Sequence, residues 1–474
     1  MNKILEQIIQ TIQYVDFNTE YTALGIDLDN VRDKKTGRVN VADDIQAVVA
    51  AKNIIINVGQ RGYLVAKNNS QIMFYDGRLW STLDVDDWEE FLLKSVTKMK
   101  KDVSLFSTVK FQKILRQTML LQIDKFEISK IDKKQVKINC MNGTLVISCD
   151  DGSFKLMPHN HKDRFRYCLN FDFSQDAEIP MFKDYINRVL PEFESQLLLQ
   201  EILGSIIAKD LKLEFFGVFL GEGSNGKSVL HSIIFALFGK ENVSTLSWRQ
   251  LFSETYLVDM DGKLLNYSSE LDSDKVHGSI DLIKILASKE PIYVRRLYNQ
   301  SYQMFDYGRL LINANRMPSL VEFSHAYLRR VQIVVFDQTI KIDEIDINLA
   351  EKIIETELPG ILNWIILGSQ RIIANRTFTQ SPKSISELNR YIREQNPVSA
   401  YVEEFGYIPS IDGQKIKFQN MYNEFIRYCR DNNLKVVNSH EFGKILRKMG
   451  FEVKKGAQNQ SFVFAAKVFC GEDG

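Results

Sequence analysis

One short segment constrains this chain more than any other. Residues 221–228 read Gly-Glu-Gly-Ser-Asn-Gly-Lys-Ser and fit the phosphate-loop pattern GxxxxGK[ST]. The apolar run before it, residues 213–220, predicts a buried parallel strand. Residues 229–238 then carry apolar side chains at helical spacing, and Gly239 ends the pattern. Strand, glycine-rich loop and helix in this order predict a nucleotide-binding α/β core.

The residues of this glycine-rich loop have separate expected roles. Glycines let the backbone curl so that its N–H groups face the phosphates, and the helix N-terminus adds favourable partial charge. Lys227 would reach the β- and γ-phosphates, and Ser228 would coordinate Mg²⁺. The expected cofactors are therefore ATP and Mg²⁺. The expected cofactor-binding residues are Gly221, Gly223, Asn225, Gly226, Lys227 and Ser228.

A nucleotide-hydrolysing site also needs an acid delivered by a neighbouring strand. Residues 263–269 predict that strand, although it is less apolar than usual, and Glu270 follows it. Asp272 lies two residues further on, so either acid could polarise the attacking water. Glu270 is the second expected Mg²⁺ ligand. The alternative is that Glu270 is an ordinary surface acid.

Two further segments could complete a hydrolytic site. Residues 309–312 predict a third strand, which leads into Asn-Ala-Asn ending at Asn315, where a polar side chain could orient water. The same residues are also compatible with a turn. Arg329 and Arg330 precede another apolar run, residues 331–336. They are either charged residues at a strand start or arginines that reach the nucleotide of a neighbouring subunit.

Together these motifs resemble the superfamily 3 helicase portion of the primase-helicases of poxviruses, phages and plasmids, over about residues 60–474. The loop has the family's style, with asparagine before its third glycine. The family's Walker B glutamate, motif C and arginine finger match Glu270, residues 315–318 and Arg330. Residues 142–145, 156–159 and 171–173 resemble the family's lead-in domain. The resemblance implies a homo-hexameric ring, ATP hydrolysis between subunits and 3′→5′ travel on single-stranded DNA in the pore.

The family also has a hairpin between Walker B and motif C, which here falls within residues 282–305. Its strands are expected at residues 292–294 and 302–304. Ser-Lys-Glu at residues 288–290 replaces the family's usual Gly-Gly-Asp. Arginine pairs with phosphate and aromatic rings stack on bases, and neither contact reads sequence. The alternative is a basic surface hairpin without DNA contact. The residues expected to line the pore are Arg295, Arg296, Tyr298 and Asn299.

The C-terminal part carries positive charge that the whole chain conceals. Lys plus Arg equals Asp plus Glu, 60 against 60, so any charge for DNA binding must be local. Residues 415–455 hold ten basic and four acidic side chains. Ser439 is a plausible N-cap for a helix over residues 440–449, and strands are expected at 451–453 and 462–465. This pattern resembles a winged helix for double-stranded origin DNA, although a solvated basic face is the alternative. The expected duplex contacts are Lys444, Arg447, Lys448 and Lys454.

The predicted architecture is α/β, an AAA+-like core with a parallel sheet, assembled as a ring hexamer. The expected domains are an α+β domain (1–100), a lead-in domain (101–205), the ATPase domain (206–380) and the winged helix (381–474). The five cysteines form no CxxC pair, which indicates a reducing compartment and no zinc site. No apolar run reaches membrane-spanning length, so the expected location is the cytosol of a bacterial host, without a membrane partner.

The functional prediction is an ATP-dependent DNA helicase that initiates replication of a phage, plasmid or genomic-island element. One alternative is an ATP-gated DNA-binding platform that assembles without unwinding. A helicase-primase is another, because Asp27 and Asp29 resemble the paired aspartates of primases. However, the first histidine is His159, and too few residues precede the lead-in domain to house a primase. A small-metabolite kinase would leave the hairpin and the basic C-terminal part unexplained.

Overall fold

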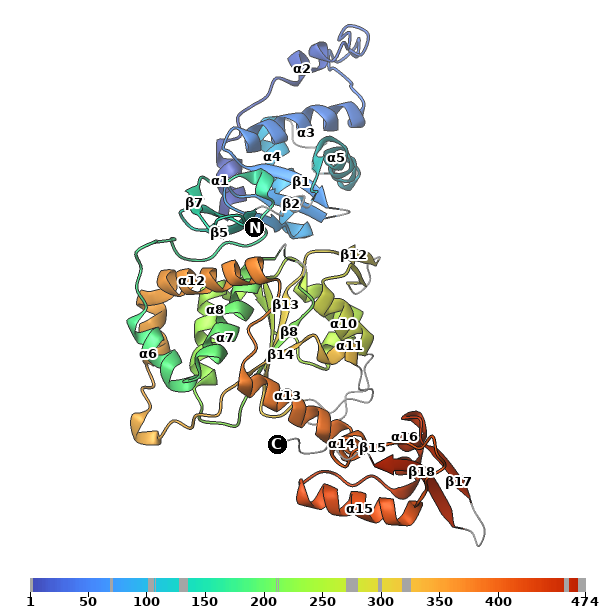
Figure 1. Ribbon diagram of the computed structural model, residues 1–474. Coiled ribbons are helices and arrows are strands. Elements are labelled where there is room, and N and C mark those ends of the chain that lie inside the picture. The colour runs from blue at the N-terminus through green and yellow to red at the C-terminus, as the bar shows by residue number, and fades with distance from the viewer. Residues whose placement is uncertain are drawn as a thin grey trace.

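The computed structural model describes residues 3–68, 71–100, 106, 108–127, 135–209, 211, 213–269, 280–296, 301–317, 325–455 and 460–467. Figure 1 shows an N-terminal lobe in blue, a central lobe in green to orange and a C-terminal lobe in red. Every described helix is too short or too polar to cross a membrane.

The N-terminal lobe combines helices with a small sheet. Its elements are α1 (Lys3–Thr11), α2 (Phe17–Ala23), α3 (Asp43–Gly59), β1 (Leu64–Asn68), β2 (Gln71–Tyr75), β3 (Trp80–Thr82), α4 (Val85–Met99), α5 (Val109–Gln122) and β4 (Asp124–Lys125). The strand order is β3-β2-β1-β4, with β1 and β4 parallel and the other pairs antiparallel. Asp84 caps α4, and Trp88 and Phe91 bury one face of that helix.

This N-terminal core extends past the expected boundary at residue 100. Helix α5 supplies Phe111, Leu115 and Met119 to the same buried cluster as α3 and α4. A second, antiparallel sheet follows, formed by β5 (Gln135–Cys140), β6 (Gly143–Ser148) and β7 (Phe154–Met157). Its buried side chains belong to the core of the central lobe. Residues 101–205, expected to form one unit, therefore divide between two hydrophobic cores.

The central lobe contains a parallel sheet and one hairpin. Its elements are α6 (Pro180–Val189), α7 (Phe193–Ile207), β8 (Phe216–Leu220), α8 (Lys227–Phe238), β9 (Val243–Ser244), α9 (Glu254–Leu257), β10 (Leu265–Ser269), α10 (Ile280–Ser288), β11 (Ile292–Val294), β12 (Tyr302–Met304), β13 (Arg309–Ala314), α11 (His325–Leu328), β14 (Val331–Val335) and α12 (Leu349–Asn375). The sheet has five strands in the order β14-β8-β13-β10-β9, and each neighbouring pair is parallel.

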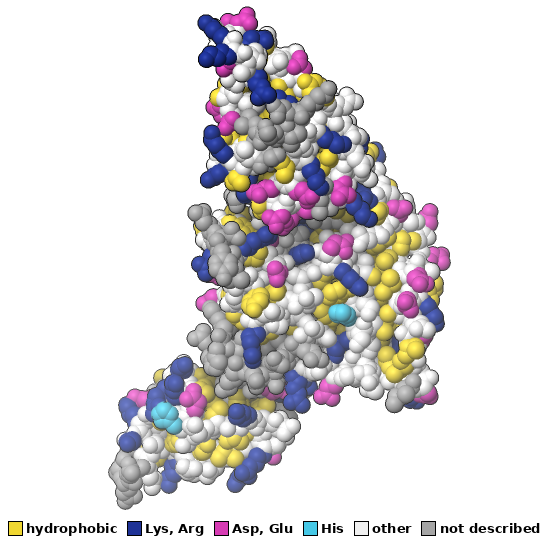
Figure 2. Space-filling model, turned by 180° about the vertical axis from the view of Figure 1, so that it is seen from behind, with side chains coloured by type: hydrophobic (Ala, Val, Ile, Leu, Met, Phe, Trp, Pro, Cys, Tyr) yellow, Lys and Arg dark blue, Asp and Glu magenta, His cyan; other side chains and the backbone are white. Residues whose placement is uncertain are grey.

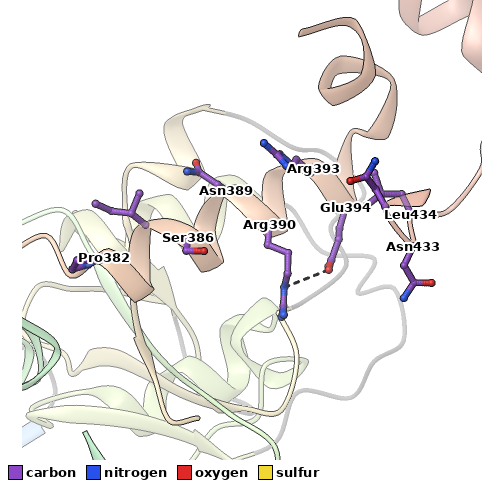
Figure 3. A pocket seen from close by; sticks show the side chains of 10 residues that line it. Pro382, Ser386, Asn389, Arg390, Arg393, Glu394, Asn433 and Leu434 are labelled. Atoms are coloured by element: carbon purple, nitrogen blue, oxygen red, sulfur yellow. Dashed lines mark ion pairs between the residues drawn. The ribbon is translucent and has the colours of Figure 1, made fainter. Parts of the chain in front are cut away.

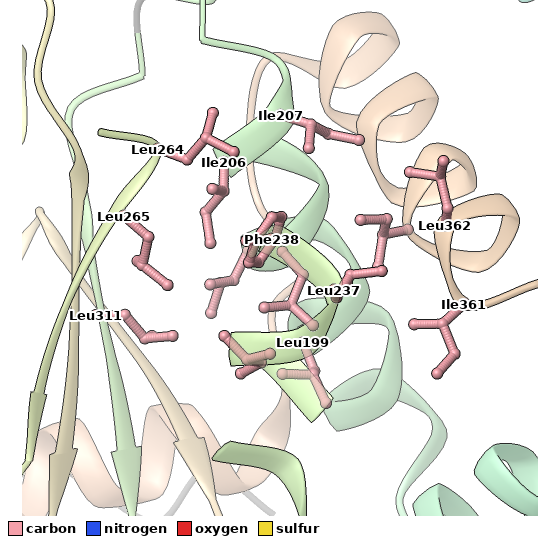
Figure 4. Close-up of a cluster of buried hydrophobic side chains, with 14 of the residues drawn as sticks. Leu199, Ile206, Ile207, Leu237, Phe238, Leu264, Leu265, Leu311, Ile361 and Leu362 are labelled. Carbon is pink, nitrogen blue, oxygen red and sulfur yellow. The ribbon is translucent and has the colours of Figure 1, made fainter. Parts of the chain in front are cut away.

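Helices cover both faces of this sheet, which explains why β8 is entirely apolar. On one face, side chains of α7, α8 and α12 converge on Leu265 and Leu311 of the sheet (Figure 4). Strand β10 is less apolar because Asn266 is buried and hydrogen bonded. Its Oδ1 accepts from the backbone N–H of Leu246 and the hydroxyl of Ser244, each at 2.9 Å. The polar side chains of Asn266 and Ser268 are therefore hydrogen bonded inside the fold, whereas the buried Tyr267 hydroxyl has no partner among the described residues.

The C-terminal lobe places helices beside a small antiparallel sheet. Helix α13 (Pro382–Gln395), whose Tyr391 is buried in the central core, leads into this lobe. The elements of the lobe are α14 (Pro397–Glu404), β15 (Tyr407–Pro409), β16 (Ile416–Lys417), α15 (Phe418–Asp431), α16 (Ser439–Lys448), β17 (Glu452–Lys455) and β18 (Ser461–Lys467). The expected helix and both expected strands are present. The expected cap is wrong: Asn438, not Ser439, is the N-cap of α16, and its Oδ1 accepts from the N–H of Glu441 at 2.9 Å.

A buried arginine joins the sheet to the helix that leads into it. The guanidinium of Arg309 donates to the carbonyl oxygens of Leu211 at 2.7 Å and Leu213 at 2.9 Å. Burial lowers the pKa of Arg309 to about 10, so this charge is held in the core at a cost. The cost is offset only while the carbonyls accept its hydrogen bonds.

We predict that Arg309→Met lowers the free energy of unfolding by about 2–3 kcal/mol, because methionine fills the space but leaves buried carbonyls without donors. Differential scanning calorimetry of the variant and the parent chain measures the change. The control is Arg427→Met, which removes an exposed arginine and should shift stability by less than about 0.5 kcal/mol. Equal stability of the two variants would contradict a structural role for Arg309.

Candidate functional site

The glycine-rich loop (residues 221–228) connects β8 to α8 at the carboxyl edge of the parallel sheet. Gly226 lies in the left-handed region at φ 84°, and its carbonyl accepts a hydrogen bond from the Tyr185 hydroxyl at 2.9 Å. A Cβ at Gly226 would lie 2.6 Å from Cγ1 of Val189. Backbone angle and close packing therefore both require glycine at this position.

Asn225 fixes the loop against the end of β14. Its Nδ2 donates to the carbonyl of Glu222 within the loop and, at 3.1 Å, to the carbonyl of Phe336. The N–H of Ile340 donates to the carbonyl of Ser224 at 2.8 Å. The segment after β14, residues 336–340, thus lies along the loop and holds its shape.

Lys227 and Ser228 begin α8 and lie differently. The Lys227 side chain is buried, and its Nζ donates to the carbonyl of Gly221. Burial lowers the pKa of the Lys227 amine, so an anion beside it would favour its protonated form. Ser228 is exposed in the first turn, where the helix N-terminus presents N–H groups to solvent. This placement suits a lysine that contacts a phosphate and a hydroxyl that contacts its metal.

Strand β13 lies between the strand of the glycine-rich loop and β10, as the water-orienting prediction requires. Glu270 and Asp272 lie outside the described residues, but Ser269, directly before them, pairs in register with Asn313. Asn315 is exposed beyond the strand end.

Asn313 belongs to the Asn-Ala-Asn segment named from the sequence, although Asn315 was the residue chosen there for the site. Its Oδ1 is buried without a hydrogen-bond partner among the described residues. Because Leu311 faces the α8 side, strand alternation places Asn313 on that side as well. Period-two alternation from Leu311 was the signal that could have found it.

The paired arginines contact the same carboxylate but differ in exposure. The side chain of Arg330 is 9% exposed, and its guanidinium lies 2.6 Å from the Glu214 carboxylate and 2.6 Å from the Ala326 carbonyl. Arg329 is 58% exposed and lies 3.2 Å from the same Glu214 oxygen. The residue matched to the arginine finger is therefore held inside its own chain, and its neighbour faces outward.

The expected hairpin is present with the expected strands, β11 and β12, paired Ile292 to Met304. Arg295 and Arg296 are exposed at the end of β11, whereas Tyr298 and Asn299 lie outside the described residues. At the departure from the family's Gly-Gly-Asp, Lys289 adopts a left-handed φ of 57°, a conformation that glycine takes more readily.

The three basic side chains of α16, Lys444, Arg447 and Lys448, lie on its exposed face, opposite the buried Phe442 and Leu446. Lys454 of β17 is also exposed and pairs with Glu452 at 2.5 Å. Figure 2 shows Lys and Arg side chains over much of the C-terminal lobe on the face in view. The local positive charge predicted from sequence is therefore on the surface.

Other candidate ligands are not assembled. No group of three or more His, Cys, Asp and Glu side chains that could hold a metal occurs among the described residues. Asp27 accepts hydrogen bonds from the N–H of Asp29 at 3.0 Å and from the Asn30 amide at 2.9 Å. Both aspartates lie on an exposed turn, as expected for surface acids rather than for a primase site.

Two family descriptions match parts of this chain, each less than half of it. Residues 52–191 match the family described as D5 N terminal like, and residues 219–330 match a family of unknown function, DUF5906. No curated protein matches the chain. The D5 N terminal like match covers the lead-in residues of the primase-helicase resemblance and points to that family at a coarse level.

Among solved structures, the fold is similar to an apo structure of the NrS-1 C terminal region, with a TM-score of 0.50 and 14% identity, covering 87% of this chain and 98% of that one. Two further apo structures of that region each have a TM-score of 0.49 and 12% identity, covering 87% and 90% of this chain and 98% and 99% of theirs. At this identity the likeness concerns the fold alone.

We predict that Gly226→Ala lowers the free energy of unfolding by about 1–3 kcal/mol, because a left-handed φ strains the alanine backbone and its Cβ would clash with Val189. Thermal unfolding without nucleotide measures this. Gly223→Ala is the matched control, since a Cβ there meets no atom within 4 Å. Equal unfolding temperatures for the two variants would contradict the loop geometry.

Proposed function

We propose that this protein is an ATP-dependent DNA helicase that assembles as a hexamer, translocates 3′→5′ and initiates replication of a mobile element. The observation that most supports this proposal is the glycine-rich loop, which hydrogen bonds hold in shape at the edge of a parallel sheet. Loops of this kind bind the β- and γ-phosphates of a nucleotide.

In this proposal, hydrolysis uses the groups around the loop. Lys227 neutralises charge on the transferred phosphoryl group, and Ser228 with Glu270 holds Mg²⁺. The chemistry that Mg²⁺ supplies is charge neutralisation on the β- and γ-phosphate oxygens. Asn315, together with Asn313, orients the attacking water between the loop and the acid strand.

A neighbouring subunit supplies an arginine to the same nucleotide. Arg329 is better placed than Arg330 to reach the nucleotide of another subunit because Arg329 is exposed. Arg330 helps to position Arg329 because both arginines contact Glu214. The exposed Arg295 and Arg296 contact single-stranded DNA, and Lys444, Arg447, Lys448 and Lys454 contact duplex DNA at an origin.

The alternative remains an ATP-gated platform that binds and assembles on DNA without unwinding it. Among the residues that the structure describes, no group favours a small-metabolite kinase, which would need no basic hairpin. Priming has no support from Asp27 and Asp29, which form an exposed turn.

We predict that Lys227→Ala reduces ATP hydrolysis at least 100-fold, because the transferred phosphoryl group loses its counter-charge. Phosphate release measures hydrolysis, and a forked duplex with a 3′ tail measures strand separation. Lys240→Ala, beyond the end of α8, is the control and should leave both rates unchanged. Hydrolysis by the parent chain without strand separation would support the platform instead.

Substitution of the two arginines should have different effects. Arg329→Ala should lower hydrolysis about 1,000-fold with normal nucleotide affinity and normal unfolding temperature, as expected for a residue acting across a subunit boundary. Arg330→Ala should also lower the unfolding temperature, because Glu214 and the Ala326 carbonyl lose a buried partner. Hydrolysis rates and thermal unfolding are measured together. Normal hydrolysis by Arg329→Ala would remove it from the proposed site.

A further inference from the structure

A groove of about 840 Å³ lies where the hairpin faces the N-terminal lobe. One wall comes from the N-terminal lobe and includes Gln71, Trp88 and Arg116. The other wall is the hairpin with its flanking residues, including Tyr293, Arg296 and Phe305. Residues distant in sequence thus line one depression, and neither family description assigns it a role.

Polar contacts beneath the hairpin hold the two walls in place. Asp261 accepts from the Arg166 guanidinium at 2.5 Å and from the Tyr302 hydroxyl at 3.0 Å. Arg166 belongs to the segment that also contacts the N-terminal lobe, where the N–H of Trp80 donates to the carbonyl of Phe165 at 2.7 Å. The groove is therefore preformed, which lowers the entropic cost of filling it.

The lining combines exposed rings with positive charge. Tyr293 is 61% exposed and Phe305 is 53% exposed. Trp88 is buried at the groove, and its Nε1 has no hydrogen-bond partner among the described residues. The exposed rings of Tyr293 and Phe305 can stack on bases of any sequence.

The charged groups at the groove favour an anion. Arg116 and Arg296 line it, and the acid among the lining residues, Asp84, is occupied as the N-cap of α4. Glu89 pairs with Arg116 at 2.8 Å, but both side chains are largely exposed. An exposed pair of this kind contributes little, so a phosphate can take over the arginine at small cost.

We propose that this groove binds unpaired nucleotides of single-stranded DNA, so that the N-terminal lobe shares the strand with the hairpin. The inference rests on the proposed helicase function and deepens it. Bases stack on Tyr293 and Phe305, and the sugar-phosphate backbone passes along Arg116 and Arg296. A strand held on two walls leaves the hairpin less readily than one held by the hairpin alone.

The test uses one helix, α5, which carries two comparable ion pairs. Arg116→Ala removes a positive charge at the groove, and Lys110→Ala removes one outside it, where Lys110 pairs with Asp43 at 3.0 Å. Fluorescence anisotropy of the full chain with a labelled oligo-dT measures affinity over a salt series. We expect Arg116→Ala to bind about three- to tenfold more weakly, with the logarithmic salt slope reduced by about 0.7.

Lys110→Ala should bind as the parent chain does, and hydrolysis without DNA should be unchanged in both variants. Equal affinities of the two variants for oligo-dT, whether weakened or not, would overturn the proposal that this groove binds single-stranded DNA. That result combined with weaker binding by Arg296→Ala would leave the helicase proposal standing. A parent chain that binds no single strand and hydrolyses no ATP would overturn the proposed function itself.

Ring stacking is tested separately from charge. Phe305→Ala should weaken oligo-dT binding about fivefold or more, since base–aromatic stacking contributes about 1–3 kcal/mol per base. Phe193→Ala removes a phenylalanine at the start of α7 that is 64% exposed, and it should leave the affinity for oligo-dT unchanged. Equal affinities for these two variants would exclude stacking in the groove.

Discussion

The side-chain amide of Asn225 connects the glycine-rich loop to the rest of the molecule. It donates to the carbonyl of Phe336, and the N–H of Ile340 donates to the carbonyl of Ser224, so the segment 336–340 lies along the loop. Within that segment, Asp337 pairs with Lys383 at 2.6 Å, in the first turn of α13. Helix α13 leads from the central lobe to the C-terminal lobe (Figure 1). A groove on its outer side, lined by Asn389, Arg390 and Arg393, separates it from the loop that follows α15 (Figure 3). A short path of polar contacts therefore runs from the glycine-rich loop to the first turn of α13.

A second set of polar contacts lies beneath the hairpin, within the central lobe. Lys209, after α7, pairs at 2.6 Å with Asp306, two residues after the end of β12. Burial alone would raise the pKa of Asp306, but Lys209 and Arg166 outweigh it and the pKa is lowered. Lys289 ends α10 nearby, with its amine 4.2 Å from the ring centre of Tyr307 and its pKa lowered well below the usual value by burial. Where the family has Gly-Gly-Asp, this chain therefore places the buried amine of Lys289 near the charged groups that hold the end of the hairpin in place.

Local patterns predicted the elements well, because each depends on neighbours in sequence. The hairpin strands agree residue for residue, since alternation and turn composition are short-range signals. What sequence could not predict depends on distant partners. Arg330 faces inward because Glu214, remote in sequence, accepts its hydrogen bonds. Helix α5 joins the N-terminal core because it packs on α3, so the boundary at residue 100 cut through that core. The N-cap of α16 lies one residue before the predicted one. Asparagine and serine are nearly equivalent caps, so their side chains alone do not determine which of the two caps the helix.

Glu214 also explains why the paired arginines have different roles. One carboxylate oxygen accepts from Arg330 at 2.6 Å and lies 3.2 Å from Arg329. A single negative charge cannot neutralise two guanidinium groups, so the pair keeps a surplus positive charge. The buried arginine takes most of the carboxylate because leaving it unpaired would cost the larger desolvation energy. The surplus therefore resides on Arg329, which is 58% exposed. An anion brought to this surface by another subunit would meet a guanidinium already held in position by its carboxylate. That arrangement lowers the entropy lost when the contact forms, which is the property that an arginine acting across a subunit boundary requires.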